Sequence, residues 1–382
     1  MKRGFAPLLG LALLVATAGC VAAYSQTYMR ASVRSPGNEV SISYFHESLS
    51  PYGQWFQDPS YGWCWTPYDV SVGWRPYYDG HWEYTDYGWS WASNETWGWA
   101  PYHYGRWFFD DSYGWVWVPG TEWAPAWVAW RYGDDWVGWA PLPPRARWDA
   151  SIGLNFADAS AIPPHQWCFV PRKHVLDASL RLQVILVARN VTLLQRSHDV
   201  TRFEVRNGRP ANVGLDIARV ESAVGRRVPR VKIIDTDTPA RGRGQPAGNG
   251  GVGFFRPTVR PSPVEQAPLA TMTERRTGFP DAVLQRQRDQ QQRKLENDLN
   301  AEHSRLTRDQ QQELRTKTPG PAVDEIRKQH AAEQQAFEAH AVQQRQVLTQ
   351  RTQKQIVKPG KAENTGKATN QGKGKGRDKK AK

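Results

Sequence analysis

Cysteine is scarce in this chain of 382 residues, which contains only Cys20, Cys64 and Cys168. Three cysteines are too few for a disulfide-rich mini-protein or for a zinc cluster built from cysteines alone. Beyond its N-terminal segment the sequence has no apolar run of 18 or more residues, and its mean hydropathy is -0.68. These absences exclude a polytopic membrane protein.

The motifs of common enzymes are also absent, since the chain has no GxSxG, HExxH, Walker loop or paired CxxC. His81 and His103 occupy corresponding positions of an internal repeat, but two histidines without a third ligand do not define a metal site. Glu83, Glu95 and Glu122 lie among tryptophans, and a sequence does not show the carboxylate separation that glycoside hydrolysis requires. We therefore expect no catalytic site, no metal and no other cofactor.

Aliphatic residues are few in residues 52–142, which hold only seven valines and leucines but 17 of the 19 tryptophans and 11 of the 14 tyrosines. So few aliphatic side chains cannot build a core, whereas each aromatic side chain buries roughly 150–250 Å². Most of the tryptophans are therefore expected in the core, and the remainder would form a ligand surface. The candidates for stacking on sugar rings are Trp82, Trp97, Trp99, Trp107, Trp123 and Trp127.

The same segment is an internal repeat. Tyr-Gly-Trp-x-Trp recurs every 26 residues at Tyr61, Tyr87 and Tyr113, and Gly-x-Trp precedes it at Gly53, Gly80 and Gly105. Aromatic runs bounded by Gly, Pro and Asp are typical of β-hairpins. The sequence therefore predicts a mainly β fold of aromatic hairpin repeats over residues 40–144.

On these motifs the chain resembles a functionally uncharacterised bacterial family of exported, often lipidated proteins. Its domain is named only as one of unknown function, and some members are labelled proline-rich exported proteins. The resemblance runs from Val40 to Pro144 and continues to residues 205–208 and 225–229. The segments Tyr77–Trp82 and Tyr102–Trp107 also resemble the YxxGxW repeat of other exported proteins. No catalytic residue is assigned in the family, so the resemblance implies none.

The N-terminus predicts export. Lys2 and Arg3 precede an apolar stretch and three small residues, which indicates a signal peptide over residues 1–19. The segment is similar to a bacterial lipobox, which implies that Cys20 is lipidated and that residues 20–39 form a tether. Val21 after the cysteine implies the outer membrane, facing the periplasm. The alternative is an ordinary cleaved signal with a free Cys20.

Export leads to an oxidising compartment, where Cys64 and Cys168 could form a disulfide. The alternative is two separately buried thiols, because a free cysteine packs as a small hydrophobic residue. The sequence leaves both open, since it does not give the Cα separation on which pairing depends.

The chain beyond residue 144 divides by composition. Residues 145–235 predict a second β-rich region, with strands over 167–170, 182–187, 190–194, 203–205 and 231–234 and a short helix over 216–224. Residues 236–280 are rich in Gly and Pro and predict a disordered linker. Residues 281–357 predict a long helical hairpin with a turn at 318–321, whose thin apolar stripes would allow self-association as a coiled coil. A basic tail over 358–382 is expected to be disordered.

Charge separates these regions, because residues 52–142 carry a net charge of -8 whereas residues 143–235 and the tail carry +7 each. We expect a non-enzymatic cell-envelope lipoprotein with a binding or structural role. Exposed aromatics beside carboxylates would bind peptidoglycan or another polysaccharide. The helical hairpin would instead make the chain a scaffold for protein partners, and an enzyme acting on glycans is the least favoured alternative. The basic tail would attract anionic lipid or lipopolysaccharide rather than nucleic acid, which an exported protein seldom meets.

Overall fold

The computed structural model describes residues 39–354 apart from 69, 72, 157, 240–244, 248–249 and 262–280. The predicted signal peptide, Cys20, nearly all of the tether and the basic tail lie outside the described residues. No helix within the described part of the chain is long and apolar enough to cross a membrane.

The aromatic segment forms four successive antiparallel hairpins. They are β2 (Gly53–Asp58) with β3 (Gly62–Pro67), β4 (Gly80–Thr85) with β5 (Gly88–Ser93), β6 (Tyr104–Asp110) with β7 (Gly114–Trp123), and β8 (Val128–Gly133) with β9 (Trp136–Pro141). In the first three, the Gly-x-Trp motif lies on the first strand and Trp-x-Trp on the second. The hairpin prediction from the repeat is confirmed.

Local hydrogen bonds explain why two of the turns share the pattern Asp-x-Ser-Tyr-Gly. The Asp58 Oδ1 atom accepts the backbone N–H of Ser60 at 2.8 Å and of Tyr61 at 3.0 Å. Asp110 makes the same two bonds at the β6–β7 turn, with Ser112 and Tyr113. The glycine after each tyrosine has a φ of +72°, a conformation that glycine adopts without steric cost.

The hairpins are joined to later strands in three larger sheets. The other elements are β1 (Glu39–Ser41), α2 (Ile42–Leu49), β10 (Arg147–Asp149), β11 (Gly153–Asn155), β12 (Cys168–Pro171), α3 (Asn190–Gln195), β13 (Ser197–Asp199), β14 (Phe203–Arg206), β15 (Arg209–Asn212), α4 (Ile217–Val224), β16 (Arg230–Asp235), β17 (Gln245–Ala247), β18 (Gly251–Phe254) and β19 (Thr258–Arg260), with short 3-10 turns η1 (Ala159–Ala161), η2 (Pro164–Gln166), η3 (Arg172–His174), η4 (Leu180–Leu182) and η5 (Val187–Arg189). In the described residues the sheet orders are β2-β3-β7-β6, β12-β9-β8-β13 and β14-β15-β5-β4-β16-β18-β17, and two smaller pairs are β1-β19 and β10-β11.

The region after residue 144 shares its sheets with the aromatic segment. Strands β12 and β13 flank β9 and β8, whereas β15 pairs with β5 and β16 with β4. The predicted helix is present as α4, with the Asp216 side chain accepting the Arg219 N–H at 2.9 Å and Gly225 ending it at a φ of +69°. The β-rich region is therefore built onto the aromatic hairpins as part of the same β body.

Two predicted strands of this region are wrong. Residues 182–187 run between the turns η4 and η5, and residues 190–194 form most of helix α3. A short apolar run does not distinguish a strand from a helix by its periodicity. Here long-range contacts decide, because the Asn190 side-chain amide donates to the carbonyls of Pro164 and Trp167 at 2.8 Å each and fixes the start of α3.

The predicted disordered linker is also wrong in part. Residues 251–260 form β18 and β19, which pair in parallel with β16 and β1. Phe254 lies 6.2 Å from Trp123 and Phe255 lies 5.2 Å from Trp99, measured between ring centroids. These two phenylalanines complete the aromatic core, which a Gly- and Pro-rich composition does not reveal.

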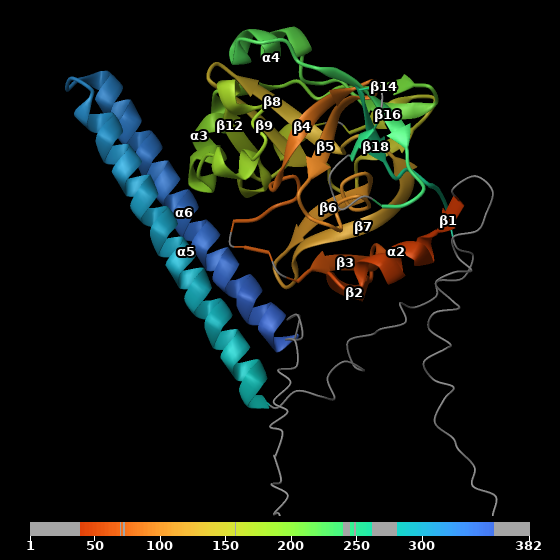
Figure 1. Ribbon diagram of the computed structural model, residues 1–382. Helices are drawn as coiled ribbons and strands as arrows, with labels where there is room; N and C mark the ends of the chain where they lie inside the picture. The colour runs from red at the N-terminus through yellow and green to blue at the C-terminus, as the bar shows by residue number, and fades with distance from the viewer. Residues whose placement is uncertain are drawn as a thin grey trace, which may run out of the picture.

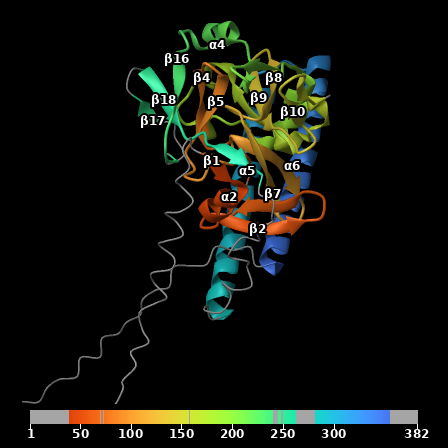
Figure 2. The ribbon, with the colours of Figure 1, turned by 90° about the vertical axis from the view of Figure 1, so that its right-hand side faces the viewer.

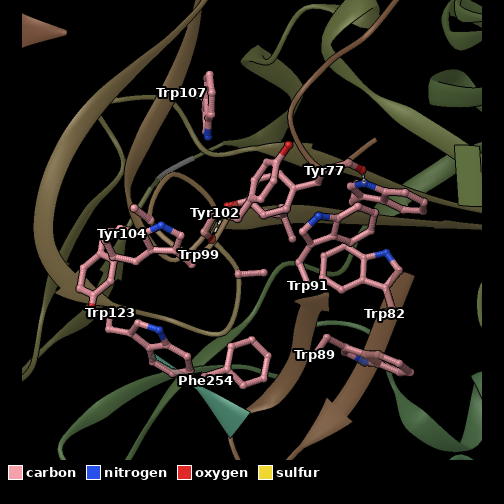
Figure 3. Packing of buried hydrophobic residues seen from close by; sticks show 14 of the residues in the cluster. Tyr77, Trp82, Trp89, Trp91, Trp99, Tyr102, Tyr104, Trp107, Trp123 and Phe254 are labelled. Carbon is pink, nitrogen blue, oxygen red and sulfur yellow. Dashed lines mark hydrogen bonds between the residues drawn. The ribbon is translucent and has the colours of Figure 1, made fainter. Parts of the chain in front are cut away.

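Tryptophan builds the core, as expected, and 17 of the 19 tryptophans are buried. The Trp82 ring centroid lies 4.9 Å from that of Trp91 and 4.5 Å from that of Trp130, in inclined arrangements that aromatic pairs favour. Figure 3 shows Trp82, Trp89 and Trp91 projecting from β4 and β5, with Trp82 and Trp91 near Tyr77. Several indoles bond the backbone, as where Trp89 Nε1 donates to the Leu215 carbonyl at 2.7 Å.

Two long helices, α5 (Asp281–Arg315) and α6 (Pro321–Gln353), form the predicted hairpin. They run side by side along one flank of the β body and extend beyond β2 (Figures 1 and 2). The apolar stripe packs within the molecule, where Leu299 and Leu306 of α5 and Phe337 of α6 meet Leu186 and Ala188 of the β body. The fold is thus mainly β with a docked C-terminal helical hairpin.

Candidate functional site

The six tryptophans predicted to stack on sugars are all buried, so these residues form no stacking surface. The side chains of Trp82, Trp97, Trp99, Trp107, Trp123 and Trp127 expose between 1% and 8% of their surface. The Trp127 indole N–H donates to the His103 carbonyl at 3.1 Å, and the Arg106 guanidinium lies 3.5 Å from the centroid of its ring. The prediction is wrong because the scarcity of aliphatic residues makes these indoles the core.

The two described cysteines are separate buried thiols, so the disulfide alternative is wrong. Cys64 lies on β3 opposite Phe56 of β2, whereas the Cys168 sulfur accepts a hydrogen bond from Arg75 Nε at 3.1 Å. Burial raises the pKa of the Cys64 thiol to about 12, and Asp58 adds to the rise. Burial also raises the pKa of the Cys168 thiol. Both side chains act as small apolar residues.

The repeat histidines make different contacts. His81 Nε2 lies 3.3 Å from Glu83 Oε1, whereas the buried His103 uses Nδ1 to contact the Ala124 carbonyl at 3.0 Å. Glu122 lies exposed on β7. Within the described residues, no group of three or more His, Cys, Asp and Glu side chains is arranged to hold a metal ion.

Glu95 is the most perturbed of the three glutamates considered from the sequence. Its Oε1 accepts the Trp74 indole N–H at 2.9 Å and its Oε2 accepts the Ser93 hydroxyl. Burial raises the pKa of Glu95 to about 7, although both hydrogen bonds oppose the rise. Its carboxyl group ties the loop at Trp74 to the end of β5, so its visible role is structural.

An aromatic surface that the tryptophan prediction missed lies on the outer face of the β2-β3-β7-β6 sheet. We define the outer aromatic layer as Phe56, Tyr61, Phe108 and Tyr113. The strand pairs Phe56–Cys64 and Phe108–Val116 place Cys64 and Val116 on the face that this layer covers, and both are fully buried. Tyr61 is 44% exposed, and its ring centroid lies 5.2 Å from that of Phe108.

The four rings of the layer are not equally open. Tyr113 stacks on Phe56 with 3.8 Å between centroids, and the Lys354 ammonium lies 3.9 Å from the centroid of the same Tyr113 ring. Both faces of Tyr113 are therefore occupied. The exposed Tyr61 and the half-buried Phe108 beside it offer the accessible part of the layer, next to the Asp58 carboxylate that orders the Tyr61 turn.

The sequence did carry a signal for this layer. Tyr61 and Tyr113 occupy the turn position of the repeat, where a side chain is exposed unless another element covers it. In the β4–β5 hairpin the corresponding Tyr87 is buried against Trp123, at 5.9 Å between centroids, and Arg256 lies 5.2 Å from its ring. The repeat thus leaves Tyr61 exposed, because no other described element covers that turn, whereas Phe56 and Lys354 cover Tyr113.

Residues 46–146 match a family of unknown function, DUF6600. This match is consistent with an uncharacterised domain, and it covers all four hairpins. No curated protein and no solved structure matches the chain.

Proposed function

We propose that the chain is a non-enzymatic envelope lipoprotein that binds peptidoglycan or a related polysaccharide through the outer aromatic layer. The observation that carries the proposal is the exposed Tyr61 ring beside the half-buried Phe108, on a sheet whose other aromatic rings are largely used in packing. Sugar rings present apolar C–H faces that pack on aromatic rings. The neighbouring Asp58 carboxylate can accept hydrogen bonds from sugar hydroxyl groups.

The rings of the outer aromatic layer are held on a rigid support, which favours binding. Asp58 orders the Tyr61 turn with two backbone hydrogen bonds, and Cys64 and Val116 fill the space beneath the rings. Ring positions fixed before binding reduce the conformational entropy lost on association. A pre-formed aromatic surface of this kind suits a polymer of repeated rings.

We also propose roles for the signal segment, Cys20 and the basic tail, which lie outside the described residues. The signal segment and Cys20 would export the chain and anchor it, and the basic tail would strengthen attachment to an anionic envelope surface. The helical hairpin buries its apolar stripe against the β body, so the proposal assigns it to the folded body rather than to a scaffold for protein partners.

Co-sedimentation with purified peptidoglycan sacculi at low and at high salt tests the proposal. Stacking on aromatics is expected to retain the protein at both salt concentrations. Attachment through the basic tail is expected to disappear at high salt, because screening shortens electrostatic attraction to about 3 Å at 1 M. Absence of pelleting at high salt would contradict binding by the aromatic layer.

A further inference from the structure

A cavity of about 310 Å³ lies between the β body and helix α5. Its walls come from the chain around Arg75 and Tyr78, from residues 181–187 and from one face of α5 that includes Glu302 and Arg305. It is distinct from the outer aromatic layer, because none of the four rings of that layer lines it.

Arg75 is a buried cation in the wall of this cavity. Its side chain is 3% exposed, its Nε donates to the Cys168 sulfur, and its Nη1 donates to the Gly73 carbonyl at 2.9 Å. Among the described residues no carboxylate lies within 4.0 Å of its guanidinium nitrogens. Removing an unpaired charge from water costs several kcal/mol by order of magnitude, so a buried guanidinium normally has an anionic partner.

The neighbouring acidic and thiol groups do not supply that partner. Asp298, on the same cavity wall, pairs with Lys294 at 3.0 Å. Glu302, on the same wall, lies more than 4.0 Å from the Arg75 guanidinium nitrogens; burial raises its pKa, and the charges of Arg75 and Arg305 oppose that rise. Burial raises the pKa of the Cys168 thiol above its ordinary value of 9.0, so this group does not supply an anion.

Two further guanidinium groups line the same space. The Arg181 side chain is 51% exposed and reaches the Asp79 carboxylate only at 4.0 Å. Arg305 is exposed on α5. An arginine side chain presents N–H donors in a fork that matches the paired oxygens of a carboxylate or a phosphate.

We propose that this cavity is a binding site for a small ligand that carries an oxyanion, either a carboxylate or a phosphate monoester, with Arg75 as its buried counter-charge and Arg181 and Arg305 at its mouth. The cavity volume suits a ligand of roughly monosaccharide size rather than a polymer. The site does not depend on the proposed glycan function, because its residues and its chemistry are different.

Isothermal titration of the full chain with D-glucose 6-phosphate, D-glucuronate and D-glucose at one ionic strength tests this site. At least one of the two anionic sugars is expected to bind while neutral glucose does not, and their relative affinity identifies phosphate or carboxylate as the preferred group. Equal binding of glucose, or no binding of either anion up to about 10 mM, would overturn the proposal.

Variants at the mouth of the cavity avoid the risk of unfolding the core. The double change Arg181→Gln and Arg305→Gln is expected to weaken anion binding at least tenfold, roughly the effect of losing one hydrogen bond to a charged group. Arg308→Gln is the matched control, because Arg308 is also exposed on α5 but does not line the cavity. Unchanged affinity in the double variant, or equal loss in the control, would overturn the proposal. Sacculus binding is expected to stay unchanged in all of them.

Discussion

The indole of Trp91 lies directly over the backbone of Gly80, on the opposite strand of the β4–β5 hairpin. A Cβ atom added to Gly80 would meet Trp91 Cζ2 at 2.7 Å and the Ala92 carbonyl oxygen at 2.4 Å. Gly53 has the same relation to Trp65 in the β2–β3 hairpin. The Gly-x-Trp and Trp-x-Trp motifs therefore occur together because the glycine of one makes room for the second indole of the other.

This relation predicts that Gly80→Ala destabilises the protein. The methyl group would contact backbone as well as the indole, and overpacking of a core costs about 1–3 kcal/mol in the free energy of unfolding. Denaturant unfolding followed by tryptophan fluorescence measures the change. Gly320→Ala is the control, because an added Cβ there meets nothing within 4 Å and the expected cost is only that of a weaker N-cap for α6, about 0.5 kcal/mol. Equal effects at both positions would contradict the packing account.

The docking of the helical hairpin is predicted to depend on Glu333 of α6. This buried carboxylate accepts hydrogen bonds from Thr192 at 2.8 Å and Gln310 at 2.9 Å, and it lies 3.6 Å from Arg189. Glu333→Ala leaves Arg189 with only Glu313 as an acidic partner and removes the acceptor of the Thr192 and Gln310 hydrogen bonds, and a buried donor left without its acceptor costs about 1–3 kcal/mol. Limited proteolysis is expected to cut the α5–α6 hairpin faster while the β body persists. Exposed Glu338→Ala should leave the cleavage rate unchanged, and equal rates in both variants would count against this contact.

Acid is predicted to weaken the packing of the same helix through His340. Burial lowers the pKa of His340 to about 3, and the nearby Arg75 and His165 lower it further. The pKa of His340 is lower in the folded protein than in the unfolded chain, where it is about 6.5. The contribution of His340 to the free energy of unfolding is therefore fully present above pH 6.5 and is lost as the pH falls toward 3. At pH 4.5 protonation of this single group in the unfolded chain is expected to cost about 3 kcal/mol of folding stability.

His340→Met tests that dependence, because neither ring nitrogen of His340 has a hydrogen-bond partner in the described residues. The variant should retain more of its neutral-pH unfolding free energy at pH 4.5 than the unaltered protein does. His303→Met is the control, since His303 is exposed on α5. The same loss of stability in His340→Met and in the unaltered protein would refute the assignment.

Glu95 is predicted to act in the opposite direction. Burial raises the pKa of Glu95 to about 7 in the folded protein, whereas a glutamate in the unfolded chain has a pKa near 4.5. The contribution of Glu95 to folding stability is therefore fully present below pH 4.5 and is lost as the pH rises through 7. Glu95→Gln is therefore expected to be more stable than the unaltered protein at pH 8, with a smaller difference at pH 5. The amide carbonyl can still accept the Trp74 N–H. Thermal unfolding at the two pH values measures the effect, and an equal shift at both would contradict the raised pKa.

The fold could be predicted where local chemistry decides it. The Asp58 turn, the Gly80 contact and the Asp216 cap of α4 each depend on residues close in sequence or repeated at fixed spacing. The strands at residues 251–260 could not be predicted, because they are held by Phe254 and Phe255 against tryptophans more than 100 residues away.

The sequence could predict that the candidate site is aromatic, but not which residues form it. Composition showed that aromatic residues must form the core and that some could remain outside. It did not show which, because exposure depends on what covers each repeat, as the burial of Tyr87 and the exposure of Tyr61 illustrate. Arg75 gave no sequence signal, since its burial without a carboxylate within 4.0 Å among the described residues is a property of the assembled cavity.

The most direct test of the account is sacculus co-sedimentation at high salt with the double variant Tyr61→Ser and Phe108→Leu. These changes remove both accessible rings, while leucine keeps apolar volume over the buried Val116. Tyr52→Ser is the control, because Tyr52 is 39% exposed and lies outside the layer. We predict that the unaltered protein and the control pellet with the sacculi and that the double variant stays in solution. Undiminished pelleting of a correctly folded double variant would contradict the assignment of glycan binding to the outer aromatic layer.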